Sequence, residues 1–142
     1  MIILRKCLKE QTHCKENKLQ DKLDNMFHLR EDFMTALRHK IPESYPEWPL
    51  DLHKKKDQQF CRDMALRGVE EMFEALQHLK NWKPHRKTEI EEFDKEEFLE
   101  EIVDAFNYFF SILILTGHTS QDLYEAYLSK DQIIHKRLKT GY

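Results

Sequence analysis

Residues 101–115 read EIVDAFNYFFSILIL, which joins two carboxylates directly to the most apolar run of the chain. From residue 105 onward, the polar side chains of this run are limited to Asn107, Tyr108 and Ser111. A helix that is apolar all round is expected to be buried on every side. The stretch therefore predicts a core helix whose first turn carries acids at the rim of the buried face. Because the chain is small, the same helix suggests that a second subunit covers part of it.

The composition favours helices over strands. The 142 residues are 40% hydrophobic and 35% charged, with only Gly 3 and Pro 4, which suits one helical core. Apolar residues recur at helical spacing over residues 19–38, 52–79, 95–116 and from about 119 to the C-terminus. We expect a single all-α domain over residues 1–142, a bundle of four to five helices in which residues 1–16 form a loosely ordered extension.

Proline and glycine mark where these helices end. Three prolines within residues 41–49 remove backbone donors and predict a loop. Gly117 is a natural C′ residue for the helix over 95–116, and Thr119 or Ser120 is a natural N-cap for the next helix. Gly68 is the one weak point of the helix over 52–79.

The net charge and the cysteines limit the class of protein. A net charge of −3 argues against a general nucleic-acid binder, which normally presents a basic surface to phosphates. Three cysteines make a poor disulfide framework, and Cys7, His13 and Cys14 lack the four closely spaced ligands of a structural zinc site. No run reaches the roughly 18 apolar residues that a membrane-spanning helix needs. We expect a cytoplasmic protein with neither nucleic acid nor membrane as a partner.

Two of the predicted helices each carry a pair of acids spaced three residues apart. The pairs are Glu71 with Glu74 and Glu101 with Asp104. Side chains at this spacing share one helix face and are close enough to bind one cation. If the two helices face each other, four carboxylates surround one cavity, and such oxygen ligands favour Mg²⁺ or Mn²⁺. A di-iron bundle would need a Glu-x-x-His pair on two helices, and neither pair contains a histidine.

A simpler interpretation of the acids remains open. An apolar stripe covers one side of the helix over 52–79, and Glu71 and Glu74 project to the other side. The stripe consists of Ala65, Leu66, Val69, Met72, Phe73, Leu76 and Leu79. Acids opposite an apolar stripe are usually a solvated face, and the protein is then a helical interaction protein without enzymatic activity.

Basic and aromatic residues could complement the acids. Lys130 and Arg137 lie near the C-terminus, and such side chains beside metal-bound carboxylates make a clamp for a di- or triphosphate. The alternative is a helix end at which basic side chains interact with the helix dipole. Trp82 either stacks on a base or fills the core after the helix over 52–79.

Together these motifs resemble a known family, the all-α dimeric dUTPases and phage dCTPase-dUTPases, which belong with the MazG-like nucleotide pyrophosphohydrolases. The resemblance covers residues 23–142, and its most specific part is the C-terminal spacing of a lysine, an arginine seven residues on and a Gly-Tyr end. The residues that carry it are Glu71-x-x-Glu74, Asn81-Trp82-Lys83, Glu101-x-x-Asp104, Lys130, Arg137 and Gly141-Tyr142.

The resemblance implies a homodimeric enzyme that hydrolyses dUTP to the monophosphate and pyrophosphate, in a bacterial cell or the cytosol of a phage-infected host. Further candidate substrates are dUDP and dCTP, and a MazG-like hydrolase with a different base preference is the alternative. It also implies roles for individual residues. The Mg²⁺ ligands, which could also bind Mn²⁺, are Glu71, Glu74, Glu101 and Asp104, and Glu71 also deprotonates the attacking water. The phosphates are held by Lys130, Arg137 and Tyr142. The residues near the nucleoside are Trp82, Asn107 and Arg30.

The chain departs from the family pattern mainly at base and sugar contacts. The family has His-Phe at Asn107-Tyr108, Lys-Asn at Lys130-Asp131, a further Asn at Ile134 and Arg-Gln at Arg137-Leu138. The family's first-helix glutamine, which reads uracil, has Arg30 in the best register. The resemblance thus retains the metal and phosphate residues and alters the residues that select the base.

Overall fold

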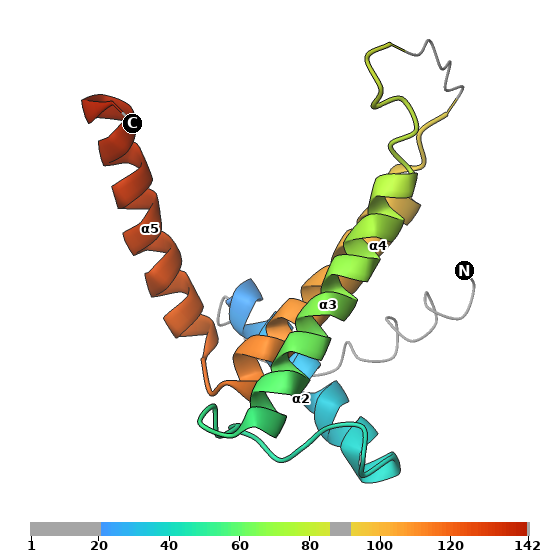
Figure 1. Ribbon diagram of the computed structural model, residues 1–142, viewed down its shortest axis with the longest axis vertical. Coiled ribbons are helices and arrows are strands. Elements are labelled where there is room, and N and C mark those ends of the chain that lie inside the picture. Colours follow the sequence, from blue (N-terminus) through green and yellow to red (C-terminus); the bar gives the residue numbers. More distant parts are fainter. Residues whose placement is uncertain (1–20, 86–91, 142) are drawn as a thin grey trace, which may run out of the picture.

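The computed structural model describes residues 21–85 and 92–141, and within them the chain forms four helices and no strand. These are α2 (Lys22–Lys40), α3 (Lys55–Gln77), α4 (Lys95–Leu115) and α5 (Ser120–Thr140) (Figure 1). The predicted all-α class is confirmed, and each predicted helix is present with ends that differ by a few residues. The expectation for residues 1–16 and the role of Tyr142 lie outside the described residues. None of the four helices is both long and apolar enough to cross a membrane.

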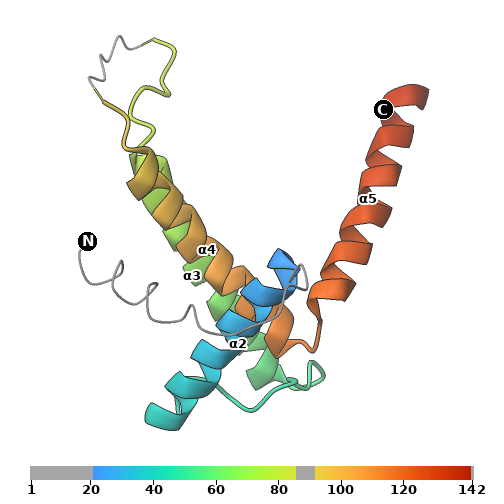
Figure 2. The same cartoon turned by 180° about the vertical axis from the view of Figure 1, so that it is seen from behind.

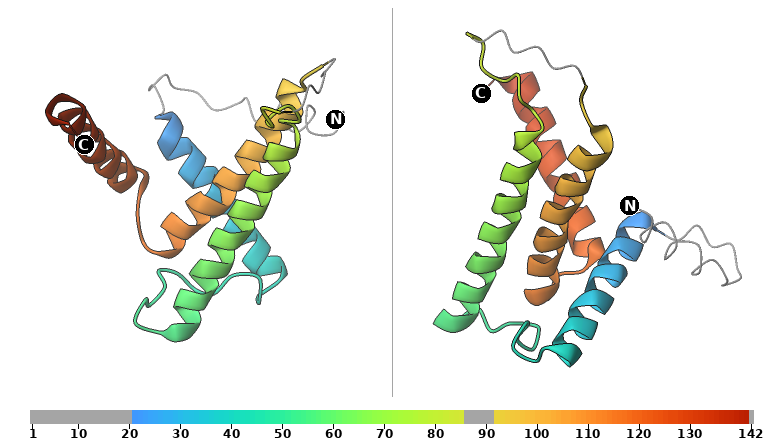
Figure 3. Two further views of the ribbon diagram at one scale, coloured as in Figure 1. Left: turned by 45° about the horizontal axis from the view of Figure 1, so that its top comes forward. Right: turned by 90° about the vertical axis from the view of Figure 1, so that its right-hand side faces the viewer.

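The centre of the molecule is the pair α3 and α4, which run side by side in opposite directions (Figures 1 and 3). Gly68 lies buried at the contact between them. A Cβ atom at this position would lie 3.0 Å from Phe109 Cε1 and 3.1 Å from Tyr108 Cβ. The residue that weakens α3 as an isolated helix therefore allows α3 and α4 to approach closely.

The buried face of α3 is not the one that its apolar pattern suggests. Met64, Gly68 and Ala75 are buried, and the partly exposed Glu71 belongs to the same row of the helix. The apolar stripe stays largely exposed, as Phe73 with 62% of its surface accessible illustrates. The interpretation that Glu71 and Glu74 share a solvated face is therefore wrong for Glu71. The small residues Gly68 and Ala75 on the same row as Glu71 let α4 pack against that side of α3.

The hydrophobic core lies where α2, the loop over residues 41–54 and the paired ends of α3 and α4 meet. Phe27 of α2 contacts Phe110 of α4 with ring centroids 5.0 Å apart. The loop predicted from the prolines contributes the buried Tyr45 and Leu50, and Leu50 N donates to Leu115 O at 2.7 Å. This packing fixes the loop against the end of α4 and places Tyr45 beside α2.

The turn between α4 and α5 confirms the predicted cap residues. Gly117 has φ +79°, a left-handed conformation that favours glycine, and His118 N donates to Leu113 O at 2.8 Å. Thr119 is the N-cap of α5 and forms a capping box with Asp122, in which each side chain bonds the other residue's backbone N–H.

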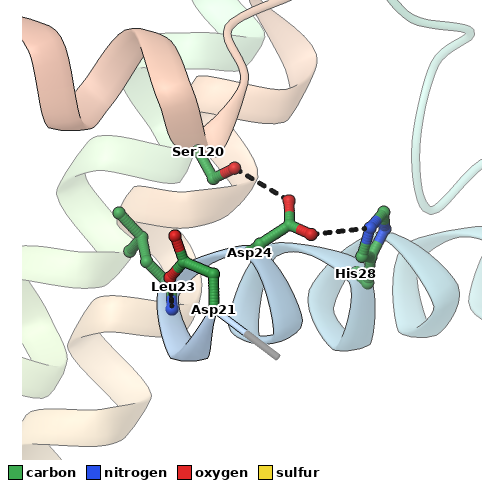
Figure 4. Close-up of polar contacts among 5 residues, drawn as sticks. All are labelled: Asp21, Leu23, Asp24, His28 and Ser120. Atoms are coloured by element: carbon green, nitrogen blue, oxygen red, sulfur yellow. Dashed lines mark hydrogen bonds and ion pairs between the residues drawn. The ribbon is translucent and has the colours of Figure 1, made fainter. Parts of the chain in front are cut away.

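Among the described residues, helix α5 is joined to the rest of the chain near its first turn. Ser120 Oγ donates to Asp24 Oδ1 at 2.9 Å, and the other Asp24 oxygen lies 3.4 Å from His28 Nε2 (Figure 4). From there α5 leads away from α3 and α4, which Figure 2 shows from behind, and it packs against α2 alone among the described helices. No residue of α5 is buried.

Candidate functional site

Three carboxylates meet where α3 and α4 run side by side. Glu71 of α3 and Glu101 and Asp104 of α4 each offer an oxygen atom, and these atoms lie within 4.8 Å of one another. The close approach of the helices at Gly68, one turn from Glu71, brings the acids together. Glu74, the fourth acid of the predicted set, is not in this group; it is exposed and lines a separate acidic cavity with Glu101.

The charges of these acids act on one another. Burial, followed by repulsion from Glu74, Asp104 and Glu101, raises the pKa of Glu71 above the ordinary carboxyl value. A cation between the carboxylates would remove this repulsion. The ligand atoms on offer are all carboxylate oxygens, without histidine or cysteine, so the donor set fits a hard divalent cation such as Mg²⁺ or Mn²⁺.

Next to the acid cluster is a cavity of about 530 Å³, a size that accommodates a nucleotide-sized ligand. Glu71 and Asp104 form part of its wall, and α2, the 41–54 loop, α3 and α4 all contribute to it. Its other lining residues are Arg30, Phe33, Leu37, Glu43, Ser44, Tyr45, Phe60, Met64, Arg67, Asn107 and Tyr108. The wall therefore combines carboxylates, two guanidinium groups and four aromatic rings.

Arg30 is held in this wall by contacts to three different segments. Its Nε donates to Ser111 Oγ of α4 at 2.7 Å, and its Nη2 donates to Tyr45 Oη of the loop at 3.1 Å. Its guanidinium carbon lies 4.8 Å from the ring centroid of Phe33. Ser111 and Tyr45 are buried, so the bonds that fix the guanidinium are shielded from water.

Asn107 connects the cavity to the acid cluster, because its Nδ2 lies 3.4 Å from Asp104 Oδ1. Together with Arg30, Phe33 and Asp104 it also lines a second, more apolar cavity of about 520 Å³ between α2 and α4. The exposed apolar residues of that second cavity are Met26, Leu29, Phe33, Val103 and Phe106.

The structure does not bring the other predicted site residues to this cavity. Lys130 and Arg137 are exposed on α5, which leads away from α3 and α4. Trp82 has 71% of its surface accessible, lies beyond the end of α3 and stacks with Lys83 Nζ 4.9 Å from its ring centroid. Of the three residues expected near the nucleoside, Arg30 and Asn107 line the cavity and Trp82 does not.

Several lining residues were not predicted from the sequence. Arg67 is exposed one turn before Glu71 and offers a positive charge beside the acids, a placement that its spacing of four residues could have indicated. Tyr45 and Phe60 line the cavity, and Ser111 binds Arg30 without lining it; the three come from different segments, and no local pattern marks them. Comparison of the chain with family models, with curated proteins and with solved structures finds no match.

Proposed function

We propose that the protein is a Mg²⁺-dependent nucleoside triphosphate pyrophosphohydrolase, which hydrolyses a deoxynucleoside triphosphate to the monophosphate and pyrophosphate. The observation that carries the proposal is the meeting of Glu71, Glu101 and Asp104 within 4.8 Å at the edge of a cavity rich in aromatic side chains. The resemblance puts dUTP first among the substrates, with dUDP and dCTP beside it, and places the reaction in cytoplasmic nucleotide-pool housekeeping.

The acids have distinct tasks in this reaction. Glu101 and Asp104, with Glu71, would hold the cation. Glu74, which is close enough to repel Glu71, would join them at a second cation. Bound Mg²⁺ supplies charge neutralisation for the phosphate oxygens. The resemblance assigns to Glu71 the proton of the attacking water, and Glu71 belongs both to the acid cluster and to the cavity wall.

The nucleoside occupies the cavity over the acid cluster. Phe33, Tyr45, Phe60 and Tyr108 offer rings against which a base can pack. Arg67, exposed at the same cavity, supplies a positive charge for the phosphates from the protein's own α3. In this proposal the bond between the first and second phosphates lies next to the carboxylates.

A second copy of the chain completes the site. The apolar residues that line the cavity between α2 and α4, and the stripe of α3 around Phe73, are exposed in a single chain, and a homodimer would bury them. Since α5 leads away from the cavity of its own chain, we place Lys130, Arg137 and Tyr142 at the phosphates of the other copy.

Product analysis tests the proposal. The purified chain is incubated with dUTP, dUDP, dCTP and purine triphosphates in Mg²⁺ or in EDTA, and the products are separated by chromatography. In Mg²⁺ alone we expect monophosphate and pyrophosphate from the triphosphates, and monophosphate and orthophosphate from dUDP. Absence of hydrolysis, release of orthophosphate from a triphosphate, or equal rates in EDTA would contradict the proposal.

A further inference from the structure

Arg30 presents unused donors to the cavity. A guanidinium has five N–H groups, and one on Nε and one on Nη2 are taken by Ser111 and Tyr45. Three remain, all on the two terminal nitrogens, which is the pair that forms a two-pronged donor. None of the ion pairs among residues 21–85 and 92–141 involves Arg30. The cavity therefore contains a positioned double donor that lacks an acceptor from the described part of the chain.

Asn107 supplies an acceptor in the same wall. A carboxylate can only accept, so the side-chain amide must turn its NH₂ group toward Asp104 Oδ1. This orientation leaves the side-chain carbonyl oxygen (Oδ1) of Asn107 as an acceptor on a residue that, like Arg30, lines the cavity. The polar wall thus offers two adjacent donors and one acceptor.

We propose that Arg30 and Asn107 select cytosine over uracil, an inference that rests on the proposed function of the cavity as a nucleotide site. The pairing edge of cytosine carries O2 and N3 as adjacent acceptors and the N4 amino group as a donor, which complements two donors and an acceptor. Uracil and thymine carry an N3–H donor between two carbonyl oxygens. That N–H would face a guanidinium N–H, and neither would find an acceptor.

The surroundings of Arg30 keep this selection rigid. Its bonds to the buried Ser111 and Tyr45 and its stacking on Phe33 prevent the guanidinium from turning away from an unsuitable base. Ser111 is itself held, because its hydroxyl donates to the backbone carbonyl oxygen of Asn107 at 2.9 Å. Ser111 therefore connects the side chain of Arg30 to the backbone of Asn107.

Equilibrium binding of nucleoside monophosphates tests the selection without requiring hydrolysis. Calorimetry with dCMP, dUMP and dTMP on the full chain in Mg²⁺ should give tighter binding of dCMP by about ten- to a hundredfold, the usual discrimination of one two-pronged contact. Equal binding, tighter binding of dUMP or no binding of any monophosphate overturns the inference.

Two substitutions at Arg30 separate selection from structural support. Arg30→Gln offers one donor and one acceptor, which match an N3–H beside a carbonyl oxygen, so the ratio of kcat/KM for dCTP to that for dUTP should fall below one. Arg30→Lys keeps the charge but loses the planar pair of donors, and the ratio should approach one. If Arg30 had a structural role alone, its substitution would lower kcat/KM for dCTP and for dUTP by the same factor. An unchanged ratio of these two values in both variants therefore overturns the inference.

The proposed hydrolysis and the proposed selection of cytosine are contradicted by different results. If no triphosphate is hydrolysed, the proposed function fails, and the binding of dCMP against dUMP still decides whether the cavity selects cytosine. If dUTP is hydrolysed faster than dCTP, the proposed function stands and the role of Arg30 and Asn107 in selection is wrong.

Discussion

A carboxylate oxygen of Glu71 on α3 lies within 4.8 Å of one of Asp104 on α4, and no basic side chain is paired with either acid among the ion pairs of the described residues. Charges of one sign at this distance destabilise the fold unless a cation separates them. This relationship connects the stability of the protein to the presence of metal.

The first prediction concerns stability without metal. Burial and the neighbouring acids raise the pKa of Glu71 in the folded state. The destabilisation by its charge is therefore absent at low pH, and it grows as the pH rises from the ordinary carboxyl pKa through the raised pKa. Glu71→Gln removes the charge, so it should raise the melting temperature in EDTA at pH 7 and change it little at pH 4. Differential scanning calorimetry at the two pH values measures the effect.

The matched control for this prediction is Glu100→Gln. Glu100 is exposed on α4 and is not in the group of three acids. It should leave the melting temperature in EDTA nearly unchanged. A destabilised Glu71→Gln variant at pH 7, or an equal gain from Glu100→Gln, would show that the acids do not repel one another as described.

The second prediction concerns Gly68. A methyl group at this position would lie 3.0 Å from Phe109 Cε1 and 3.1 Å from Tyr108 Cβ, so these side chains of α4 must shift by a few tenths of an ångström. Gly68→Ala should cost about 1–3 kcal/mol of unfolding free energy, although alanine favours the helix. Urea denaturation measures the cost, and Ala75→Gly on the same buried row is the complementary change, whose smaller loss should come from backbone entropy and a lost methyl contact. A stabilised Gly68→Ala protein would contradict the close packing.

The third prediction concerns the start of α5. Thr119→Ala removes the capping box and should cost about 1 kcal/mol. The N–H and the hydroxyl of Thr119 lower the pKa of Asp122. The stabilisation from this bond is therefore fully present at pH values above the ordinary carboxyl pKa, and it is lost as the pH falls through the lowered pKa of Asp122. Thr140→Ala, at the other end of α5, is the control and should change the unfolding free energy little. Equal losses from the two variants, or a loss that grows at acidic pH, would be inconsistent with the cap.

The fourth prediction concerns the α5 arm. Lys130 and Arg137 are seven residues apart and share one helix face, whereas Lys139 lies on the opposite face. Lys130→Ala and Arg137→Ala should each lower kcat/KM for the triphosphate roughly ten- to a hundredfold, the effect of losing a hydrogen bond to a charged group. Steady-state kinetics with Lys139→Ala as the control measures the difference, and equal effects of all three would remove the arm from the phosphate site.

Mixing two impaired variants shows which copy supplies the arm. Asp104→Asn lacks a metal ligand but has an intact arm, and Arg137→Ala has the reverse. A mixed dimer contains one site with both parts intact if the arm crosses to the other copy, so the activity of the mixture should rise above the activity of either variant alone. Activity that stays at or below that of Arg137→Ala alone, in a mixture shown by sedimentation to contain dimers, would place the arm in its own chain.

The sequence predicted those parts of the fold that depend on local patterns. The end of α4 at Gly117 and the cap at Thr119 follow from backbone preferences of single residues, and both are confirmed. The choice of the buried face of α3 depends on α4, and the apolar stripe around Phe73 gave the wrong answer because small residues at Gly68 and Ala75 permit the closer packing.

The candidate site was predictable to a similar depth. Spacing alone indicated Glu71 with Glu74 and Glu101 with Asp104, because acids three residues apart share a helix face, and three of these four acids lie together in the structure, without Glu74. The setting of Arg30 was beyond local reasoning, since its bonds reach Tyr45 in the loop and Ser111, which is 81 residues further along the chain. Such contacts exist only after the core has assembled.

Calorimetric titration of Mg²⁺ tests the central claim, that the acids hold the cation that serves a nucleotide. The titration is made in the presence of a dUTP or dCTP analogue whose bond between the first and second phosphates cannot be hydrolysed, with the wild-type chain, Asp104→Asn and the control Glu100→Gln. We predict saturable Mg²⁺ binding by the wild type and the control and its loss in Asp104→Asn. Equal binding by Asp104→Asn, or no binding by the wild type, would contradict the account.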